Sequence, residues 1–267
     1  YDNATNGDTI ILLNSTSGEG ISINKSITID LRTYTYTFKA PGAGSTGTES
    51  QGFQLLKNNT VTLQNGNIAI AENTNVKWMF NAYANVTLAG LNVNCTNMAT
   101  PAANESNYVL VVNNGGGATP TVNYSGVNVT NFPSTEQIWL DPTTTFKAVA
   151  GLENSIKTEA GYVVVYKDGA YTAVKANVQV KDGETVKGTY ATIAEAVAAA
   201  QAGNTIKLLA DITEDVTVNK NLTIDGANAE GGKFDYTGKM TANNGLTVTV
   251  QNIDFVGGGF DKSNKSS

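Results

Sequence analysis

The sequence predicts an all-β fold in which short parallel strands stack in successive coils, a β-solenoid. Strand-sized apolar runs follow one another along most of the chain, and many alternate with Thr, Asn or Ser as half-buried strands do. One stretch of these runs occurs twice, which is typical of a repeat architecture. An antiparallel sandwich would also contain many short strands. We prefer the solenoid because no gap between the runs of the first half is a two-residue Asn-Gly or Asp-Gly hairpin turn.

The stretch from residue 191 to residue 225 shows this organisation most clearly. Thr192 and Glu195 have the spacing of a capping box at the start of a helix. Apolar residues then follow at helical spacing and form one stripe, consisting of Ile193, Ala196, Val197 and Ala200. Gly203 is placed to end this helix in a left-handed conformation. Three short strands are expected after it, at 205–209, 216–218 and 222–225.

The beginning of the chain repeats this stretch. Residues 4–13 align with 200–209, residues 21–30 with 216–225, and residues 61–65 with 248–252. The chain therefore contains two copies of one module. The first copy lacks its leading helix, since Tyr1 falls inside the last helical turn, and we expect the chain to be a piece of a longer protein or a processed product.

The first module contains a succession of strand-sized runs. They lie at 9–13, 21–23, 27–29, 34–38, 53–56, 61–63, 68–71, 78–80, 86–88, 91–93, 108–112, 122–124, 127–129 and 138–140. Asn65 and Asn252 follow equivalent strands, and we expect each to form a left-handed bend and bond to a neighbouring coil, with a polar ligand contact as the alternative. Residues 41–52, 98–107 and 115–117 read as projecting loops, where binding residues tend to lie.

Four segments follow from these patterns. Residues 1–140 form a first solenoid block, and residues 141–188 form a short β connector containing a hairpin that turns at Asp168-Gly169. Residues 189–256 form a capping helix and a shorter second block, in which the helix covers an otherwise open end. Residues 257–267 are expected to be a flexible tail, because they are rich in Gly, Ser and Lys.

The run from residue 194 to residue 226 resembles the opening of pectate-lyase-like right-handed parallel β-helix repeats. Such repeats occur in bacterial and archaeal surface proteins called adhesin-like, and in phage fibres. The resemblance is clearest at residues 8–30 and 191–225 and fades across residues 141–188. It implies a right-handed parallel β-helix, but it does not imply an activity, since the same fold carries lyases, hydrolases and inert stalks.

Composition excludes several classes of function. Charged residues make up 15% of the chain against about 25% in typical domains, and the net charge is −6 with Arg32 as the only arginine. Nucleic-acid binding is not expected without clustered Lys or Arg. No stretch is long and apolar enough to insert into a membrane. The chain has no histidine, which removes His-based catalysis and metal sites, and its one cysteine, Cys95, is expected to be a core residue.

Carboxylate chemistry remains as a route to an enzyme. The densest acidic group is Asp211, Glu214 and Asp215, after the first strand of the second module. We expect these three carboxylates to be solvent-exposed residues of a turn. The alternative is a calcium site of a polysaccharide lyase, as the resemblance implies, and no other cofactor is expected.

Two further patterns point to carbohydrate. Six aromatic residues could form a sugar-stacking face if they point outward, and otherwise line the core: Trp78, Phe80, Tyr83, Tyr108, Tyr124 and Trp139. Eleven Asn-x-Ser/Thr acceptors occur where chance predicts about six. They are either the ordinary polar alternation of strands and turns or N-glycosylation sites: Asn3, Asn14, Asn24, Asn58, Asn85, Asn94, Asn104, Asn123, Asn128, Asn221 and Asn264.

From the sequence we therefore predict a non-enzymatic, structural or adhesive β-solenoid at the cell surface or outside the cell. It would form part of a surface protein or filament, with self-association, a neighbouring surface protein or glycans as partners. A polysaccharide lyase or hydrolase of the same fold is the first alternative. A phage fibre or capsid-decorating protein is the second.

Overall fold

The computed structural model describes residues 1–47, 49–101, 103 and 105–262. They form two compact units, and each is described by itself. Unit 1 consists of Tyr1–Ala160 and Val164–Ala173, and unit 2 consists of Gly161–Val163 and Val174–Ser267. Strands account for most of the ordered structure, and most neighbouring strands are parallel, which confirms the predicted all-β class.

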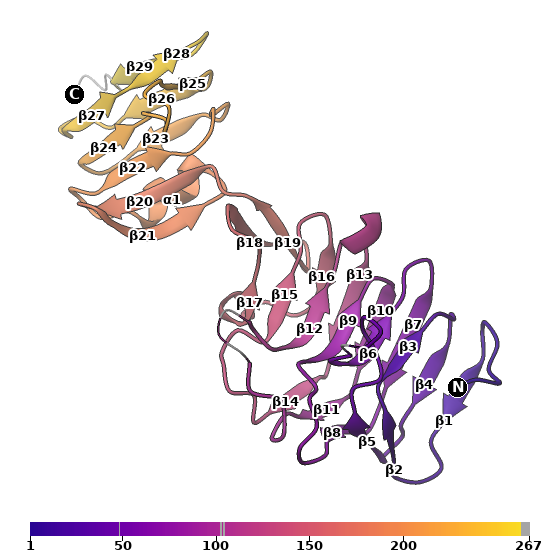
Figure 1. Ribbon diagram of the computed structural model, residues 1–267. Coiled ribbons are helices and arrows are strands. Elements are labelled where there is room, and N and C mark those ends of the chain that lie inside the picture. Colours follow the sequence, from indigo (N-terminus) through magenta and orange to yellow (C-terminus); the bar gives the residue numbers. More distant parts are fainter. Residues whose placement is uncertain (48, 102, 104, 263–267) are drawn as a thin grey trace. The chain divides into compact units, whose positions relative to one another are not determined.

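Unit 1 is built from three sheets, which the chain visits in turn (Figure 1). Sheet A contains β1 (Thr9–Ile11), β4 (Thr28–Asp30), β7 (Thr60–Gln64), β10 (Asn85–Ala89), β13 (Thr121–Ser125), β16 (Thr145–Lys147), β19 (Ala170–Lys175) and β18 (Tyr162–Lys167). Sheet B contains β2 (Thr16–Glu19), β5 (Thr35–Ala40), β8 (Asn67–Ile70), β11 (Asn92–Asn94) and β14 (Asn128–Thr130). Sheet C contains β3 (Ile21–Ile23), β6 (Gln51–Leu55), β9 (Trp78–Ala82), β12 (Tyr108–Val112), β15 (Ile138–Leu140) and β17 (Ile156–Lys157).

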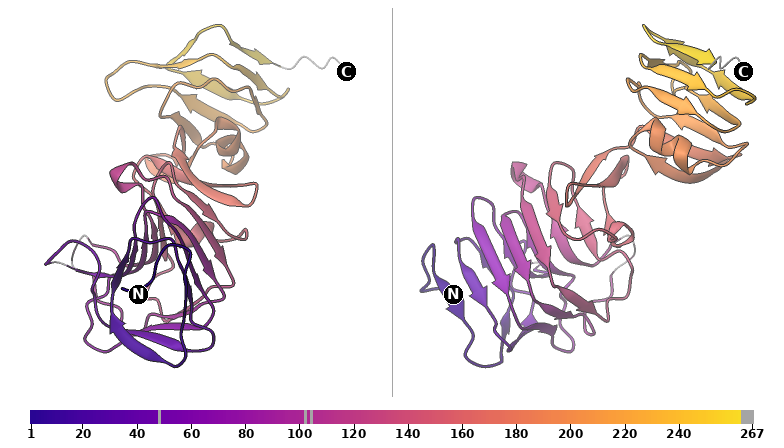
Figure 2. Two further views of the ribbon diagram at one scale, coloured as in Figure 1. Left: turned by 90° about the vertical axis from the view of Figure 1, so that its right-hand side faces the viewer. Right: turned by 180° about the vertical axis from the view of Figure 1, so that it is seen from behind.

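The strands of each sheet lie side by side along unit 1 (Figure 2), and their parallel register brings like residues into columns. In sheet A, Val61, Val86, Val122 and Phe146 occupy partner positions on successive strands and are all buried. In sheet C the corresponding column runs through Phe53, Phe80, Leu110 and Ile138. Alternation along each strand supplies the apolar residues of these columns and places Thr, Asn and Gln between them. The core of unit 1 therefore lies between the three sheets.

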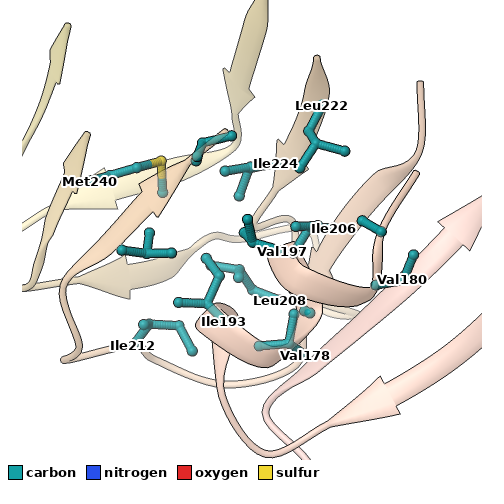
Figure 3. Close-up of a cluster of buried hydrophobic side chains, with 14 of the residues drawn as sticks. Val178, Val180, Ile193, Val197, Ile206, Leu208, Ile212, Leu222, Ile224 and Met240 are labelled. Atoms are coloured by element: carbon teal, nitrogen blue, oxygen red, sulfur yellow. The ribbon is translucent and has the colours of Figure 1, made fainter. Parts of the chain in front are cut away.

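Unit 2 repeats this plan with fewer strands. Its parallel strands are β22 (Thr205–Leu208), β24 (Leu222–Asp225) and β27 (Val248–Gln251) in sheet D, β25 (Phe234–Tyr236) and β28 (Ile253–Phe255) in sheet E, and β23 (Val216–Val218), β26 (Lys239–Ala242) and β29 (Gly259–Lys262) in sheet F. The antiparallel strands β20 (Val178–Asp182) and β21 (Thr185–Tyr190) complete sheet D on the side of β22. Figure 3 shows side chains from β20, β22, β24 and β26 meeting around the single α-helix of the described residues.

That helix, α1 (Ile193–Ala199), begins where the sequence predicts. The Thr192 hydroxyl accepts from the Glu195 N–H at 3.1 Å and the Glu195 carboxylate accepts from the Thr192 N–H at 3.2 Å, so the capping box is present. The predicted apolar stripe is buried in the core. The helix ends earlier than expected, because Ala200 is already extended, and Gly203 (φ +90°) lies in the following turn rather than at the helix end. The Lys220 ammonium instead satisfies the last carbonyls, donating to Val197, Ala198 and Ala200.

The predicted repeat is confirmed by equivalent contacts in the two units. Asn65 (φ +58°) donates from Nδ2 to Asp30 Oδ1 at 2.9 Å, and Asn252 (φ +52°) donates to Asp225 Oδ1 at the same distance. The Asn65 amide and then the Arg32 N–H lower the pKa of Asp30 below its ordinary value. At Asp225, burial raises the pKa of the carboxyl group. Hydrogen bonds from the Ala227 N–H, Asn252 and Lys207 outweigh burial, so the pKa lies below its ordinary value. Asn65 and Asn252 are therefore turn residues that bind a neighbouring coil, as expected.

The segments expected as connector and tail are organised differently. The hairpin is present, with Asp168 and Gly169 at positive φ between β18 and β19, but its strands extend sheet A of unit 1. Strands β20 and β21, from the same expected connector, belong to sheet D of unit 2. The expected flexible tail begins with β29, which pairs with β26 and brings Phe260 against the core of unit 2. Residues 263–267 lie outside the described residues.

Candidate functional site: an aromatic cleft on sheet C

Three of the six aromatic residues singled out in the sequence line one cleft of unit 1. Trp78, Tyr108 and Trp139 come from the successive strands β9, β12 and β15 and lie along a hollow of about 620 Å³, here called the aromatic cleft. Trp139 is tilted against Tyr108, with 5.7 Å between ring centroids. Both tryptophans of the chain are in this cleft and both are half buried, so their rings are accessible to a ligand.

A local break in strand alternation turns these rings toward the cleft. Met79 and Phe80 are consecutive and both fully buried, and so are Val109 and Leu110 in the paired strand, where exposure is 1% or less. Trp78, which precedes them, therefore lies half buried at the rim of the cleft. Its partner Tyr108 also lines the cleft but is only 6% exposed, so most of its ring belongs to the core. Trp139 follows the ordinary alternation, because its neighbours Ile138 and Leu140 are buried.

Polar groups fix the rings and line the cleft beside them. The Trp139 indole N–H donates to Asp141 Oδ1 at 2.5 Å, and the other Asp141 oxygen accepts from the Asn114 N–H. The Trp78 indole N–H donates to the Ser106 carbonyl at 3.2 Å. Lys77 and Glu105, which also line the cleft, form an ion pair. Flat apolar rings bordered by carboxylate, amide and ammonium groups match the two faces of a sugar ring, which has apolar C–H surfaces and polar hydroxyl edges.

The other three aromatic candidates are elsewhere. Phe80 is fully buried, with its ring stacked on that of Phe53 at 5.9 Å. Tyr124 packs against Phe146 at 5.3 Å and burial raises its pKa to about 12. Tyr83 lines separate hollows beside β6 and β9.

The acidic group in unit 2 is not gathered into one site. Asp211 accepts from the Asp235 N–H, Glu214 from the Ile193 N–H at the start of α1, and Asp215 from the Lys239 N–H. Each carboxylate thus holds a different part of the backbone. Within the described ranges no group of three or more acidic or cysteine side chains is placed to hold a metal ion.

Cys95 and the acceptor asparagines follow clear burial patterns. Cys95 is 2% exposed, and burial raises the pKa of its thiol to about 12, so the predicted core role is confirmed. Of the eleven Asn-x-Ser/Thr asparagines, Asn104 and Asn264 lie outside the described residues, and the other nine are all exposed. Exposure is required for modification of a folded chain, but it also suits polar turn and strand positions.

Sequence reasoning missed the polar part of the cleft. Asp141 marked an expected segment boundary, and Glu105 and Ser106 lay within an expected loop, without any role assigned to them. The only available signal was the general tendency of loops to carry binding residues. The side chains meet because β12, β15 and the loop before β12 are adjacent in space.

No protein-family model, curated protein or solved structure matches this chain. The resemblance to pectate-lyase-like repeats therefore has no independent support. None of the helices within the described ranges has the length and apolar character needed to cross a membrane.

Proposed function

We propose that this chain is a non-enzymatic carbohydrate-binding β-solenoid, whose aromatic cleft holds a saccharide of a surface or matrix glycan. The observation that carries the proposal is that the half-buried rings of Trp78 and Trp139 lie along one open cleft, with the buried Tyr108 packed against Trp139. Asp141, Asn113 and Lys77 line the same cleft. Stacking on aromatic rings provides affinity, while fixed polar groups at the rim provide orientation.

Binding without catalysis suits the state of the two carboxylates in the cleft. Asp141 accepts two hydrogen bonds, from Trp139 and Asn114, and Glu105 is paired with Lys77. Both carboxylates are thus engaged in contacts within the protein, whereas glycoside hydrolysis uses a pair of carboxyl groups that act on the scissile bond. The polysaccharide lyase or hydrolase alternative has no specific observation in its favour.

The finer fold and the location belong to the same proposal. We infer that both units are right-handed parallel β-helices, because strands of three sheets recur in a fixed order and pair with the equivalent strands before and after. A rigid solenoid holding a glycan site suits an extracellular or cell-surface protein or filament. All nine acceptor asparagines within the described residues are exposed, which is compatible with a glycoprotein.

Tryptophan fluorescence tests the binding proposal directly, since both tryptophans lie in the cleft. Titration with soluble mannan, xylan, mixed-linkage β-glucan and N-acetylglucosamine oligomers is expected to change the emission with at least one of them. Trp139→Ala should weaken that binding at least tenfold, about 1.4 kcal/mol, because it removes a stacking surface. Absence of any response in the whole panel would refute the proposal.

Two control variants distinguish the loss of an aromatic stacking surface from a general loss of folding. Trp139→Phe keeps an aromatic ring and should retain most of the affinity. Tyr34→Ala removes a half-buried tyrosine that lies outside the cleft, so it should bind like the parent chain. Equal weakening by both alanine variants would show that the effect of Trp139→Ala is not specific to the cleft.

The glycoprotein part is tested by intact mass spectrometry of protein from its native source. Added hexose-type masses should map to exposed acceptors outside the binding surface, such as Asn123 or Asn128. An unmodified mass would leave the Asn-x-Ser/Thr pattern as strand and turn chemistry alone.

A further inference from the structure

A second hollow lies near the aromatic cleft in unit 1. Two adjoining cavities of about 400 and 640 Å³ share Lys57, Asn58, Asn59 and Tyr83 in their lining, and are here called together the Tyr83 hollow. The Lys57 ammonium reaches the Gly116 carbonyl at 3.0 Å and so holds the loop 115–117 at the rim. Tyr83 lies so close to this loop that a Cβ on Gly115 would meet its ring at 2.8 Å.

A column of register partners in sheet C runs from the lining of the hollow to the lining of the cleft, and its middle residues, Asn81 and Val111, are buried. Gln54, which lines the hollow, is the register partner of Asn81, Asn81 is the partner of Val111, and Val111 is the partner of Trp139 in the cleft. Three strand spacings of about 4.8 Å give roughly 14 Å between the ends of this column. That span exceeds a single sugar and suits a short oligosaccharide.

Hydrogen bonds between side-chain amides connect the lining of the aromatic cleft with the lining of the Tyr83 hollow. Asn113 lines the cleft and donates from Nδ2 to Asn81 Oδ1 at 3.1 Å. Asn81, which is fully buried, donates to Gln51 at 3.1 Å and to the Tyr83 hydroxyl at 3.4 Å. This network fixes Asn113 and Tyr83 relative to each other, so the linings of the cleft and of the hollow are held in one arrangement before a ligand binds.

We propose that the Tyr83 hollow is a second saccharide subsite of the aromatic cleft, so that the ligand is a linear oligosaccharide spanning both. The inference rests on the proposed carbohydrate binding. Tyr83 offers a ring for stacking, and Lys57, Asn58 and Asn59 offer donors and acceptors to hydroxyl groups. Asn113, which lines the cleft, contacts the middle of the bound oligosaccharide in this arrangement.

The test is the dependence of affinity on ligand length. Oligosaccharides from the disaccharide to the hexasaccharide, prepared from the polysaccharide that binds best in the panel above, are titrated and followed by tryptophan fluorescence. The parent chain should bind the hexasaccharide at least tenfold more tightly than the disaccharide. Tyr83→Ala should lose most of this gain and keep the disaccharide affinity, because the aromatic cleft is intact.

Two further variants make the result decisive. Tyr83→Phe keeps the ring and should retain the gain with length. Lys57→Gln removes the ammonium donor at the far end and should lower the hexasaccharide affinity alone, which provides the test if Tyr83→Ala does not fold. Identical length dependence in the parent, Tyr83→Ala and Lys57→Gln would overturn the second subsite while leaving the cleft in place. Failure of the parent to bind any member of the panel would instead refute the proposed function itself.

Discussion

Replacement of Phe80 by alanine is expected to lower the free energy of unfolding by about 3–5 kcal/mol. Phe80 is fully buried at the centre of the sheet C column, stacked on Phe53, and Phe53 in turn packs against Phe38 from sheet B at 5.1 Å. Phe80 lies between its register partners Phe53 and Leu110 on the two adjacent parallel strands, so a cavity at Phe80 cannot close without moving both neighbours. Chemical denaturation followed by circular dichroism measures the change.

Phe80→Leu is the graded control for this prediction. It keeps an apolar side chain in the column and removes less volume, so its cost should be well below that of Phe80→Ala. The prediction also distinguishes a core position of Phe80 from a position on an outward sugar-stacking face, since an exposed aromatic residue would tolerate replacement by alanine. A change below about 0.5 kcal/mol for Phe80→Ala would contradict the core position.

Replacement of Gly238 by alanine is expected to destabilise unit 2 by about 1–3 kcal/mol. Gly238 is buried before β26, and an added Cβ would come within 3.2 Å of three backbone atoms of Glu214 and Asp215. Backbone of an adjacent coil cannot rotate away as a side chain can. The Asp215 carboxylate holds this same contact by accepting the Lys239 N–H, so displacement of the turn would also weaken that bond.

Gly259→Ala is the matched control. Gly259 pairs with Lys239 in the neighbouring strand of sheet F, and a Cβ there would meet nothing within 4 Å. Its cost should remain within about 0.5 kcal/mol. Equal destabilisation by both alanine variants would show that the loss of glycine itself, and not the close backbone approach at Gly238, causes the effect.

Local signals in the sequence predicted local structure well. The capping box at Thr192 and Glu195, the buried stripe of α1 and the Asp168-Gly169 turn are confirmed because each depends on residues a few positions apart. The end of α1 was misplaced, since Gly203 takes its positive φ in the following turn, while Lys220, distant in sequence, satisfies the helix carbonyls.

Comparison of the two copies predicted more than either copy could. Asn65 and Asn252 follow equivalent strands of the two copies, and each was expected to bond to a neighbouring coil. Each does so in the structure, with Asp30 and Asp225 as the acceptors. A repeated pattern constrains spacing across whole coils, which single-strand periodicity does not. The strands of the expected connector could not be assigned in the same way, because they have no second copy and pair with whichever sheet edge lies next to them.

The all-β class, the two copies of the module and the turn residues were predictable from the chain alone, because alternation, spacing and turn chemistry are properties of neighbouring residues. Which aromatic residues face outward depends on how strands that are distant in sequence pack against one another. Trp78 and Phe80 have the same parity in one strand, yet the consecutive burial of Met79 and Phe80 separates them, so one lines the cleft and the other fills the core. The same packing brings Asp141 and Glu105 to those rings, since side chains distant in sequence come together only when the coils stack.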